Sequence, residues 1–225
     1  MPQTLALDIY GTLIDTSAVF STLKLLVPDK ADEVMLSWRK KQLEYSFRRG
    51  LMNRHVDFAI CTRDALRYVN REYGCNLGES EQSELLLAYK TLPAFHDVKE
   101  CLERCRADGH GINAFSNGGQ ADVKNLLSHS GIQSFFDGII STEEVKSFKP
   151  DPAVYNHFTQ SADSQAANTW LISGNPFDVM GALACGWKSA WVNRQTDLTF
   201  DPWDEFEPTI VIQSLNDLCK AISKF

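Results

Sequence analysis

The chain has 225 residues, of which 44% are hydrophobic and 23% are charged. This size and composition allow one large domain, or a main domain with a smaller one, and they exclude a largely disordered chain. The 22 basic and 29 acidic residues give a formal net charge of -7 with no basic block, which argues against a nucleic-acid partner. An anionic substrate would therefore need a few cations gathered in one site.

The first ten residues, MPQTLALDIY, lack the charged region and the long apolar run of a signal peptide. No apolar stretch approaches the ~18–20 residues that a membrane-spanning helix needs. The six cysteines form no CxxC pair, and free thiols in a reducing compartment explain them best. We therefore expect a cytoplasmic protein without a membrane partner.

Short apolar runs alternate with helical stretches along much of the chain. The pattern predicts strands at residues 5–9, 111–115, 138–141, 169–172 and 189–192, and a sixth at 209–212. It predicts helices at residues 97–108, 120–130, 151–162, 177–185 and 214–223. Gly109 suits a helix C-terminus, and Asp151-Pro152 suits a helix start. Such alternation predicts a parallel sheet with helices on both faces.

Residues 16–92 break this alternation, because their pattern is helical and contains no convincing strand. An apolar stripe at helical spacing predicts a buried helix face there, formed by Met35, Leu36, Leu43, Phe47 and Leu51. The predicted fold class is therefore α/β with a Rossmann-like parallel sheet. Residues 1–15 and 93–225 would form the core domain, and residues 16–92 would form a helical cap domain inserted after the first strand.

Polar residues gather where the predicted strands end. Asp8 ends the first strand, Ser116-Asn117 the second and Ser173-Gly174-Asn175 the fourth, while Lys149 lies in the loop after the third. Open parallel sheets bind their ligands at the carboxyl ends of the strands. A cap inserted after the first strand would lie above the same edge. This convergence predicts an active site more strongly than any single residue does.

Each of these residues also has a structural explanation. Asp8 could be a nucleophile that forms an ester, but an Asp that caps a turn is equally common. Ser116 and Asn117 could bind an anion at a helix N-terminus, although a simple helix cap is the better explanation for them alone. Lys149 could hold Asp8 ionised or be a solvated surface lysine. Asp178, in the first turn of a helix, could simply complement the helix dipole.

One cation of the helical segment could also face the site. Arg39 lies at the edge of the apolar stripe, next to Met35 and Leu43, but a helical wheel places Lys40 there equally well. Periodicity therefore does not choose between the two.

Four motifs follow one another along the chain: Asp8-Ile9-Tyr10-Gly11-Thr12-Leu13, Ser116-Asn117-Gly118, Lys149-Pro150 and Asn175-Pro176-Phe177-Asp178. They resemble the four motifs of the haloacid dehalogenase superfamily, in the same order and with a helical cap between the first two. The resemblance extends from residue 5 to about residue 194. Each motif is weakly specific, whereas the ordered set is highly specific.

Tyr10 assigns the branch of the superfamily. The phosphatases of the superfamily generally carry a second Asp at this position, as general acid and base. A phenol does not replace a carboxylate in that role, but a halide leaving group needs no proton. The Asp-x-Tyr-Gly-Thr-Leu form resembles the L-2-haloacid dehalogenases, as do the segments 38–45, 149–155 and 191–194. This resemblance assigns the functional cation of the cap to Arg39 and not to Lys40.

The resemblance implies a two-step reaction on a small L-2-haloacid. Asp8 would displace halide from C2 and form an ester, and water would then hydrolyse the ester at its carbonyl carbon, leaving a D-2-hydroxyacid. No metal or other cofactor is implied, and the partners would be the haloacid, water and halide. The implied site residues are Arg39, Asn117, Phe177 and Tyr10 around the halide, Thr12 and Ser116 near the substrate carboxylate or the nucleophile, Tyr155 among the substrate-binding residues, Lys149 beside Asp8 with support from Ser173, and Asn175 and Asp178 around the hydrolytic water.

Three other functions remain open. A Mg²⁺-dependent phosphatase of the same fold would keep Asp8 and Asp178 as metal ligands. A hydrolase of another electrophilic carbon would keep the nucleophile without a halide. A non-catalytic binding protein fits poorly, because no motif position is visibly lost. A homodimer is a further expectation from the resemblance.

Overall fold

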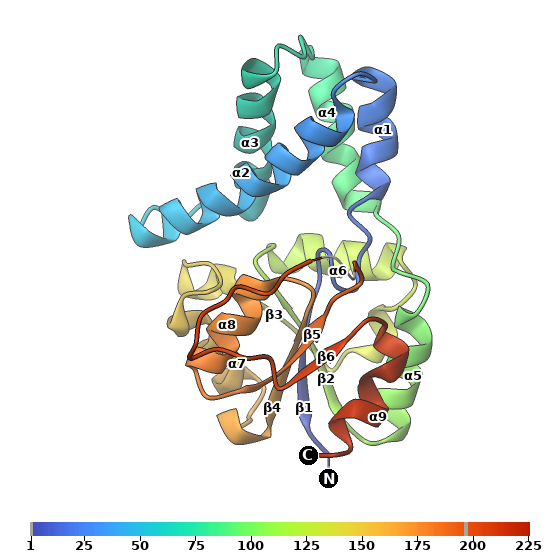
Figure 1. The fold of residues 1–225 in the computed structure, drawn as a ribbon, viewed down its shortest axis with the longest axis vertical. Coiled ribbons are helices and arrows are strands. Elements are labelled where there is room, and N and C mark those ends of the chain that lie inside the picture. The colour runs from blue at the N-terminus through green and yellow to red at the C-terminus, as the bar shows by residue number, and fades with distance from the viewer. Residues whose placement is uncertain (1, 196–197) are drawn as a thin grey trace.

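The computed structural model describes residues 2–195 and 198–225, and in this part of the chain six strands form one parallel sheet. The strand order is β3-β2-β1-β4-β5-β6, so β1 lies between β2 and β4 (Figure 1). The strands are β1 (Thr4–Asp8), β2 (Gly111–Ser116), β3 (Gly138–Ser141), β4 (Thr169–Ser173), β5 (Lys188–Val192) and β6 (Ile210–Ile212). The α/β class and the six predicted strands are confirmed.

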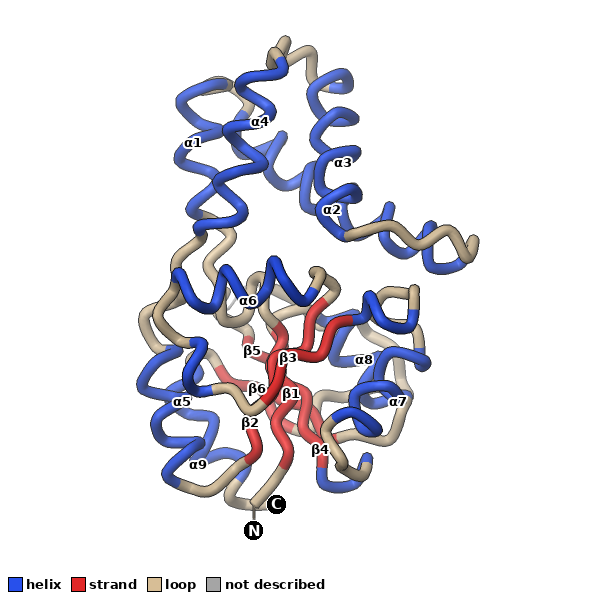
Figure 2. Tube along the Cα trace, turned by 180° about the vertical axis from the view of Figure 1, so that it is seen from behind, coloured by secondary structure: helices blue, strands red, loops and turns tan. Residues whose placement is uncertain are grey.

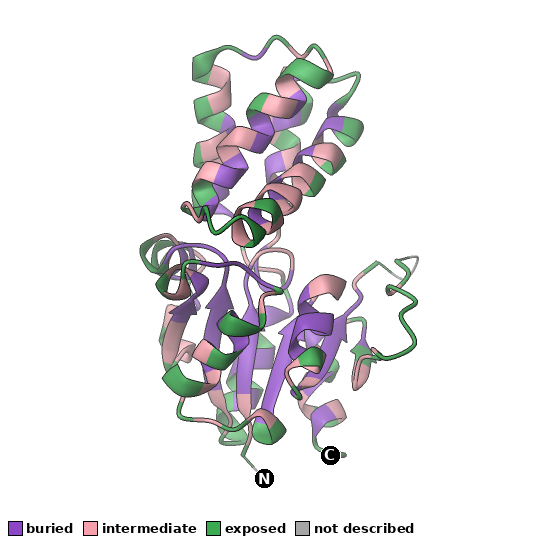
Figure 3. Cartoon of the chain, turned by 90° about the vertical axis from the view of Figure 1, so that its left-hand side faces the viewer, coloured by how far each residue is buried: buried purple, intermediate pink, exposed green. Residues whose placement is uncertain are grey.

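Helices cover both faces of the sheet, because alternate strand residues face opposite sides. Leu5 and Leu7 belong to the apolar cluster that contains residues of α5 (Val98–Ala107), α6 (Gln120–His129) and α9 (Leu218–Ile222). Ala6 and Phe115 belong to a second cluster, with residues of α7 (Pro152–Ser161) and α8 (Pro176–Ala184). Figure 2 shows α5 and α9 on one side of the sheet and α7 and α8 on the other. The central strands are consequently buried on both faces (Figure 3).

The helix ends show where local signals succeed and where they fail. Asp151 caps α7 by accepting a hydrogen bond of 2.9 Å from the Ala153 amide, as the Asp-Pro pair predicts. The helical segment predicted at 214–223 is present, but it begins with a 3₁₀ turn (Leu215–Asp217) and only α9 is α-helical. The buried Asp97 carboxylate accepts hydrogen bonds from the Ser214 hydroxyl (2.8 Å) and the Leu215 amide (2.9 Å), and thereby anchors the start of this segment. The other 3₁₀ turns are Tyr89–Thr91, Gln133–Phe135, Thr142–Val145 and Ala166–Asn168.

Four helices follow β1 and lie beyond the carboxyl ends of the strands (Figures 1 and 2). They are α1 (Ala18–Leu26), α2 (Ala31–Leu51), α3 (Phe58–Glu72) and α4 (Glu79–Ala88). Residues 16–92, all of which the structure describes, contain no strand, so their helical character is confirmed. Their assignment as a cap domain, separate from a core of residues 1–15 and 93–225, remains a prediction. In the described ranges, no helix has both the length and the apolarity that crossing a membrane requires.

The buried face of α2 differs from the predicted stripe. Leu36 and Leu51 are 58% and 87% exposed, whereas the residues of α2 that are buried are Ala31, Val34, Trp38, Gln42 and Ser46. This face packs on α3 with polar groups in the contact, since the Trp38 indole donates a hydrogen bond of 2.9 Å to the Thr62 carbonyl. The apolar periodicity of the sequence therefore predicted the wrong buried face for α2.

Candidate active site

Three strands end in residues that were predicted to carry chemistry. Asp8 is the last residue of β1, Ser116 of β2 and Ser173 of β4. β1 pairs with both β2 and β4, so these three ends are adjacent. β2 and β3 extend the sheet on one side of β1, and β4 to β6 extend it on the other. Open α/β sheets bind ligands at such a change of direction.

The Asp8 carboxylate is almost completely enclosed by donors. Its Oδ2 atom accepts hydrogen bonds from the Thr12 hydroxyl (2.8 Å), the Ser173 hydroxyl (3.2 Å) and the Asn175 amide nitrogen (2.7 Å). Its Oδ1 atom accepts one from Lys149 Nζ at 3.1 Å. All four partners donate, which matches the acceptor-only form of an ionised carboxylate. The group is thus held in one orientation at the edge of the sheet.

Lys149 lies beneath this carboxylate and is 1% exposed. Its ammonium donates hydrogen bonds to Asp8 Oδ1 (3.1 Å), Asp178 Oδ2 (2.7 Å) and the Phe115 carbonyl (2.9 Å), which uses all three of its protons. Burial alone would lower the pKa of Lys149, but the two carboxylates outweigh it and raise that pKa above its ordinary value. Lys149 is therefore a fixed positive charge between Asp8 and Asp178.

Asp178, in the first turn of α8, is 0% exposed. Burial raises the pKa of Asp178 to about 6, although Lys149 opposes that rise. Its Oδ1 atom accepts a hydrogen bond of 2.8 Å from the Tyr155 hydroxyl. Both carboxylate oxygens of Asp178 thus have donors within the fold, so Asp178 does not face the hydrolytic water as predicted, and its direct effect is on Lys149.

Two other predicted roles also need correction in light of these contacts. Tyr155, expected among the substrate-binding residues, is 0% exposed, and its hydroxyl contacts Asp178 instead of a pocket. Ser173, expected to support Lys149, donates to Asp8 and accepts a hydrogen bond of 3.1 Å from the Asn175 amide N–H. Sequence position cannot reveal either contact, because each depends on how the ends of different strands meet.

Ser116 and Asn117 organise the loop after β2. Ser116 Oγ accepts a hydrogen bond of 3.0 Å from the Gly118 amide. Asn117 Oδ1 accepts one of 2.9 Å from the Lys149 backbone amide, and so anchors the loop that carries the lysine. Both side chains lie at the predicted edge of the sheet and are almost completely buried.

Arg39, from α2, reaches across to the sheet. Its guanidinium donates hydrogen bonds to Gln42 Oε1 (2.6 Å) and to Asn175 Oδ1 (3.3 Å). Asn175 in turn holds Asp8, so the arginine lies one side chain away from the carboxylate. Lys40 is exposed. The geometry therefore places Arg39, and not Lys40, beside the strand ends.

Aromatic rings border the site on two sides. The Tyr10 and Phe58 ring centroids are 6.3 Å apart, and Phe177 packs edge-on against Phe47 of α2 at 5.1 Å. Burial, followed by the negative charge of Asp122, raises the pKa of Tyr10 above its ordinary value. Tyr10 consequently stays a neutral phenol at physiological pH and cannot serve as a carboxylate-like base.

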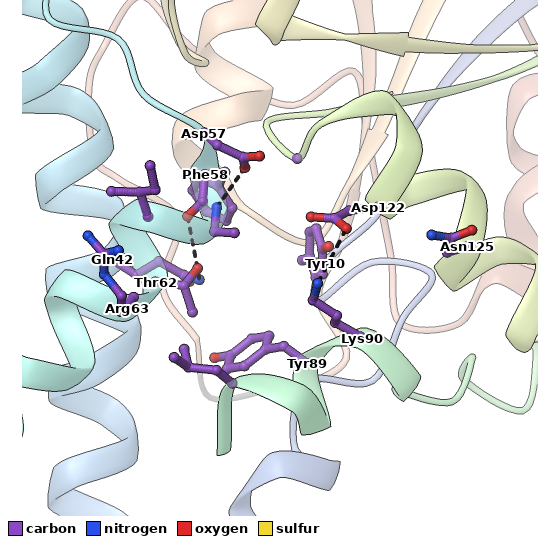
Figure 4. A pocket seen from close by; sticks show the side chains of 14 residues that line it. Tyr10, Gln42, Asp57, Phe58, Thr62, Arg63, Tyr89, Lys90, Asp122 and Asn125 are labelled. Atoms are coloured by element: carbon purple, nitrogen blue, oxygen red, sulfur yellow. Dashed lines mark hydrogen bonds and ion pairs between the residues drawn. The ribbon is translucent and has the colours of Figure 1, made fainter. Parts of the chain in front are cut away.

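A cavity of about 450 Å³ lies between α2, α3 and α4 and the loops that follow β1 and β2 (Figure 4). Tyr10 and Gly118 line it from the sheet side, and Gln42, Phe58 and Tyr89 line it from the helical side. The volume lies in the usual range for small-molecule sites, roughly 300–1,000 Å³. Burial raises the pKa of Tyr89 to about 12, and its hydroxyl has no hydrogen-bond partner in residues 2–195 and 198–225.

Several residues of the site were not predicted from the sequence. Gln42 lies one helical turn after Arg39, which could have drawn attention to it. Arg194 donates to the Thr12 carbonyl (3.0 Å) and pairs with Asp97, and thereby anchors the loop after β1. No pattern in the chain connects residues 97 and 194 with residue 12, so only the fold reveals this anchor.

A sequence model of haloacid dehalogenase-like hydrolases matches residues 6–192. The (S)-2-haloacid dehalogenase of Pseudomonas putida is 33% identical to this chain over 216 residues, which cover 96% of this chain and 94% of that protein. The chain belongs to the haloacid dehalogenase-like hydrolase family. The predicted resemblance is thereby confirmed.

Solved structures agree with this family membership. The L-2-haloacid dehalogenase of Xanthobacter autotrophicus superposes on this haloacid dehalogenase-like hydrolase with a TM-score of 0.89 at 29% identity, covering 100% of both chains. A structure of the Xanthobacter autotrophicus enzyme with chloropropionic acid covalently bound has a TM-score of 0.89 at 29% identity and covers 99% of both chains. Within the family, this hydrolase is thus similar to the 2-haloacid dehalogenases.

Proposed function

We propose that this protein hydrolyses the carbon–halogen bond of small L-2-haloacids and releases D-2-hydroxyacids, without a metal, through an ester on Asp8. The observation that carries the proposal is the Asp8 carboxylate, held by four donors at the end of β1. The similarity to (S)-2-haloacid dehalogenases, and the related structure that holds chloropropionic acid covalently, support it.

The unequal contacts of the two Asp8 oxygens suit two different roles. Oδ1, which has the single donor Lys149, attacks C2 in line and becomes the ester oxygen. Oδ2 becomes the carbonyl oxygen, and its three donors then stabilise the negative charge that develops when water adds. One preorganised donor of this kind typically contributes about 2.7–4 kcal/mol to the transition state. The Cγ–Oδ1 bond then breaks. Lys149 passes a proton to Oδ1 and regains one from the added water, so the hydroxyacid leaves with Oδ1 as its hydroxyl oxygen and the lysine stays charged.

The remaining assignments concern the substrate and the water. Arg39, with Asn117, Phe177 and Tyr10, surrounds the departing halide, because a guanidinium next to aromatic edges favours a diffuse anion. The Ser116 hydroxyl oxygen accepts a hydrogen bond from the Gly118 amide, so its O–H group can donate one to the substrate carboxylate. This contact lies close to the loop that carries Thr12.

Asn175 positions the hydrolytic water. Asp178 acts through Lys149, which it holds charged. Tyr155 acts through Asp178.

A magnesium-dependent phosphatase is a poorer fit to this site. The Lys149 ammonium already lies within 3.1 Å of Asp8 and 2.7 Å of Asp178, the two carboxylates that would have to share a cation. Tyr10 also stands where a phosphatase needs a general acid and base. These observations do not distinguish a dehalogenase from a hydrolase of another electrophilic carbon. Tests with different substrates distinguish the two.

A substrate panel tests the proposed function. L-2-chloropropionate should release chloride and give D-lactate, while D-2-chloropropionate should be nearly inert, because a fixed nucleophile and a pinned carboxylate admit one enantiomer to in-line attack. Chiral chromatography of the product identifies the configuration. Retention of configuration, equal use of both enantiomers, or phosphate release from p-nitrophenyl phosphate without halide release would refute the proposal.

Location and assembly are further proposals. A cytoplasmic protein is supported by the six cysteines, all of which carry free thiols, even where Cys105 Sγ and Cys219 Sγ lie 3.2 Å apart. A homodimer remains a prediction, which light scattering of the purified protein would test.

A further inference from the structure

A continuous chain of hydrogen bonds runs from α3 through α2 to the nucleophile. Gln42 Nε2 donates to Thr62 Oγ1 (2.6 Å), and Arg39 donates to Gln42 Oε1 (2.6 Å). Arg39 also donates to Asn175 Oδ1 (3.3 Å), whose amide nitrogen donates to Asp8 (2.7 Å). Gln42 is thus the link between the helical segment and the cation that reaches the strand ends.

The orientation of the Gln42 amide is determined by Thr62. The Thr62 hydroxyl has one proton, which it donates to the Phe58 carbonyl at 3.0 Å. Its oxygen can therefore only accept from Gln42, so the amide must turn its NH₂ group to Thr62 and its carbonyl to Arg39. The opposite orientation would point two N–H groups at the guanidinium, which has no acceptor.

Burial makes this arrangement rigid. Gln42 is 1% exposed and Thr62 is 6% exposed, and both line the cavity between the helical segment and the sheet (Figure 4). A buried amide that loses its hydrogen-bond partners destabilises the fold. The Gln42 amide therefore keeps both of its hydrogen bonds. The Trp38 indole fixes the same part of α2 to the Thr62 carbonyl. Gln42 therefore holds one nitrogen of the Arg39 guanidinium in place before any ligand binds.

We propose that Gln42 is a positioning residue that aims the Arg39 guanidinium at the departing halide. The inference rests on the proposed dehalogenation. Arg39 has five N–H donors, of which Gln42 and Asn175 engage two, so the others can meet a halide. The halide carries its full charge only late in the displacement, so a correctly aimed guanidinium stabilises the transition state more than the bound substrate. Loss of this aim should therefore lower kcat more than it raises KM.

The leaving group provides the readout. Chloride is a poorer leaving group than bromide, so displacement of chloride depends more on stabilisation of the departing anion. Gln42→Met keeps the shape of the side chain and removes both hydrogen bonds. We expect it to lower the single-turnover rate on L-2-chloropropionate by roughly 10–100-fold, the range typical of losing a residue that orients the ligand of a metal site. The loss on L-2-bromopropionate should be several-fold smaller, and the KM for both acids should change by less than about threefold.

A matched pair of variants at Thr62 keeps the test valid if Gln42→Met does not fold. Thr62→Val removes the oxygen that orients Gln42 and keeps the volume, so it should reproduce the chloride-selective loss. Thr62→Ser keeps the hydroxyl and should retain nearly the wild-type rate on both acids. Thermal unfolding of each variant reports whether the fold is intact.

The outcomes separate the inference from the proposed function. Equal losses on the two halides, or no loss in Gln42→Met and Thr62→Val, would show that the pair only stabilises the fold. A wild-type protein that releases halide from neither acid would refute the proposed function and, with it, this inference. Selective loss of chloride turnover in Gln42→Met and Thr62→Val, together with rescue by Thr62→Ser, would support the inference.

Discussion

Lys149 offers the sharpest test of the electrostatics of the site. Its side chain is 1% exposed and lies between the Asp8 and Asp178 side chains, which are 10% and 0% exposed. Lys149→Met would leave two carboxylates at the same place with no cation between them. Breaking a buried ion pair from one side typically costs about 3–5 kcal/mol. We expect the free energy of unfolding to fall by about that amount at pH 7, and halide release to be lost.

The pH dependence of this loss follows from the direction of the pKa shift. Without Lys149, the pKa of Asp178, already raised to about 6 by burial, rises further in the folded state. A carboxyl group whose pKa is higher in the folded than in the unfolded state destabilises the fold at pH values above its unfolded pKa, and the penalty shrinks as the pH falls and the group takes up a proton. The stability difference between wild type and variant should therefore narrow from pH 7 to pH 5.

Urea unfolding at several pH values measures this difference. Lys124→Met, at an exposed lysine of α6, is the matched control and should remain close to wild type. Adding Asp178→Asn to Lys149→Met should recover part of the lost stability, because it removes one of the unpaired charges. A variant as stable as wild type, or a loss that does not change with pH, would refute the reasoning.

Three further predictions concern activity. Arg39→Ala should lower turnover of L-2-chloropropionate by roughly 100-fold or more, whereas Lys40→Ala, at an exposed position, should have little effect; equal losses measured by chloride release would mean that the cation is misassigned. Excess EDTA should leave chloride release unchanged, since Lys149 supplies the positive charge beside Asp8, and a loss that Mg²⁺ restores would favour the phosphatase alternative. The rate should fall as the pH drops below about 6, where Asp178 takes up a proton and no longer balances Lys149, so a pH–rate profile that stays flat to pH 4.5 would contradict that role.

The sheet could be predicted because its signals are local. Each strand is a short apolar run between turn residues, and the Asp151-Pro152 start of α7 is a cap formed by neighbouring residues. The strand ends then bring Asp8, Ser116 and Ser173 together by topology alone. That step needs no knowledge of side-chain contacts, so the location of the site was accessible from the sequence.

The inner face of α2 could not be predicted in the same way. Its buried positions include Gln42 and Ser46, and a search for apolar periodicity favours the exposed Leu36 and Leu51 instead. Gln42 is tolerated inside because Thr62, twenty residues away on α3, satisfies it. Tyr155 was misassigned for a related reason, since its partner Asp178 lies on the neighbouring helix. Contacts of this kind depend on tertiary packing, which single-sequence patterns do not encode.

The ester on Asp8 is the central claim, and isotope placement tests it most directly. In a single turnover in ¹⁸O-labelled water, with enzyme in excess over L-2-chloropropionate, the oxygen that enters the product should come from the Asp8 carboxylate. The lactate should therefore be unlabelled, and the peptide that contains Asp8 should gain about one ¹⁸O atom, as hydrolysis of the ester at its carbonyl carbon requires. Labelled lactate together with an unlabelled Asp8 peptide would mean that water attacks C2 directly, and would contradict the role of Asp8 as nucleophile.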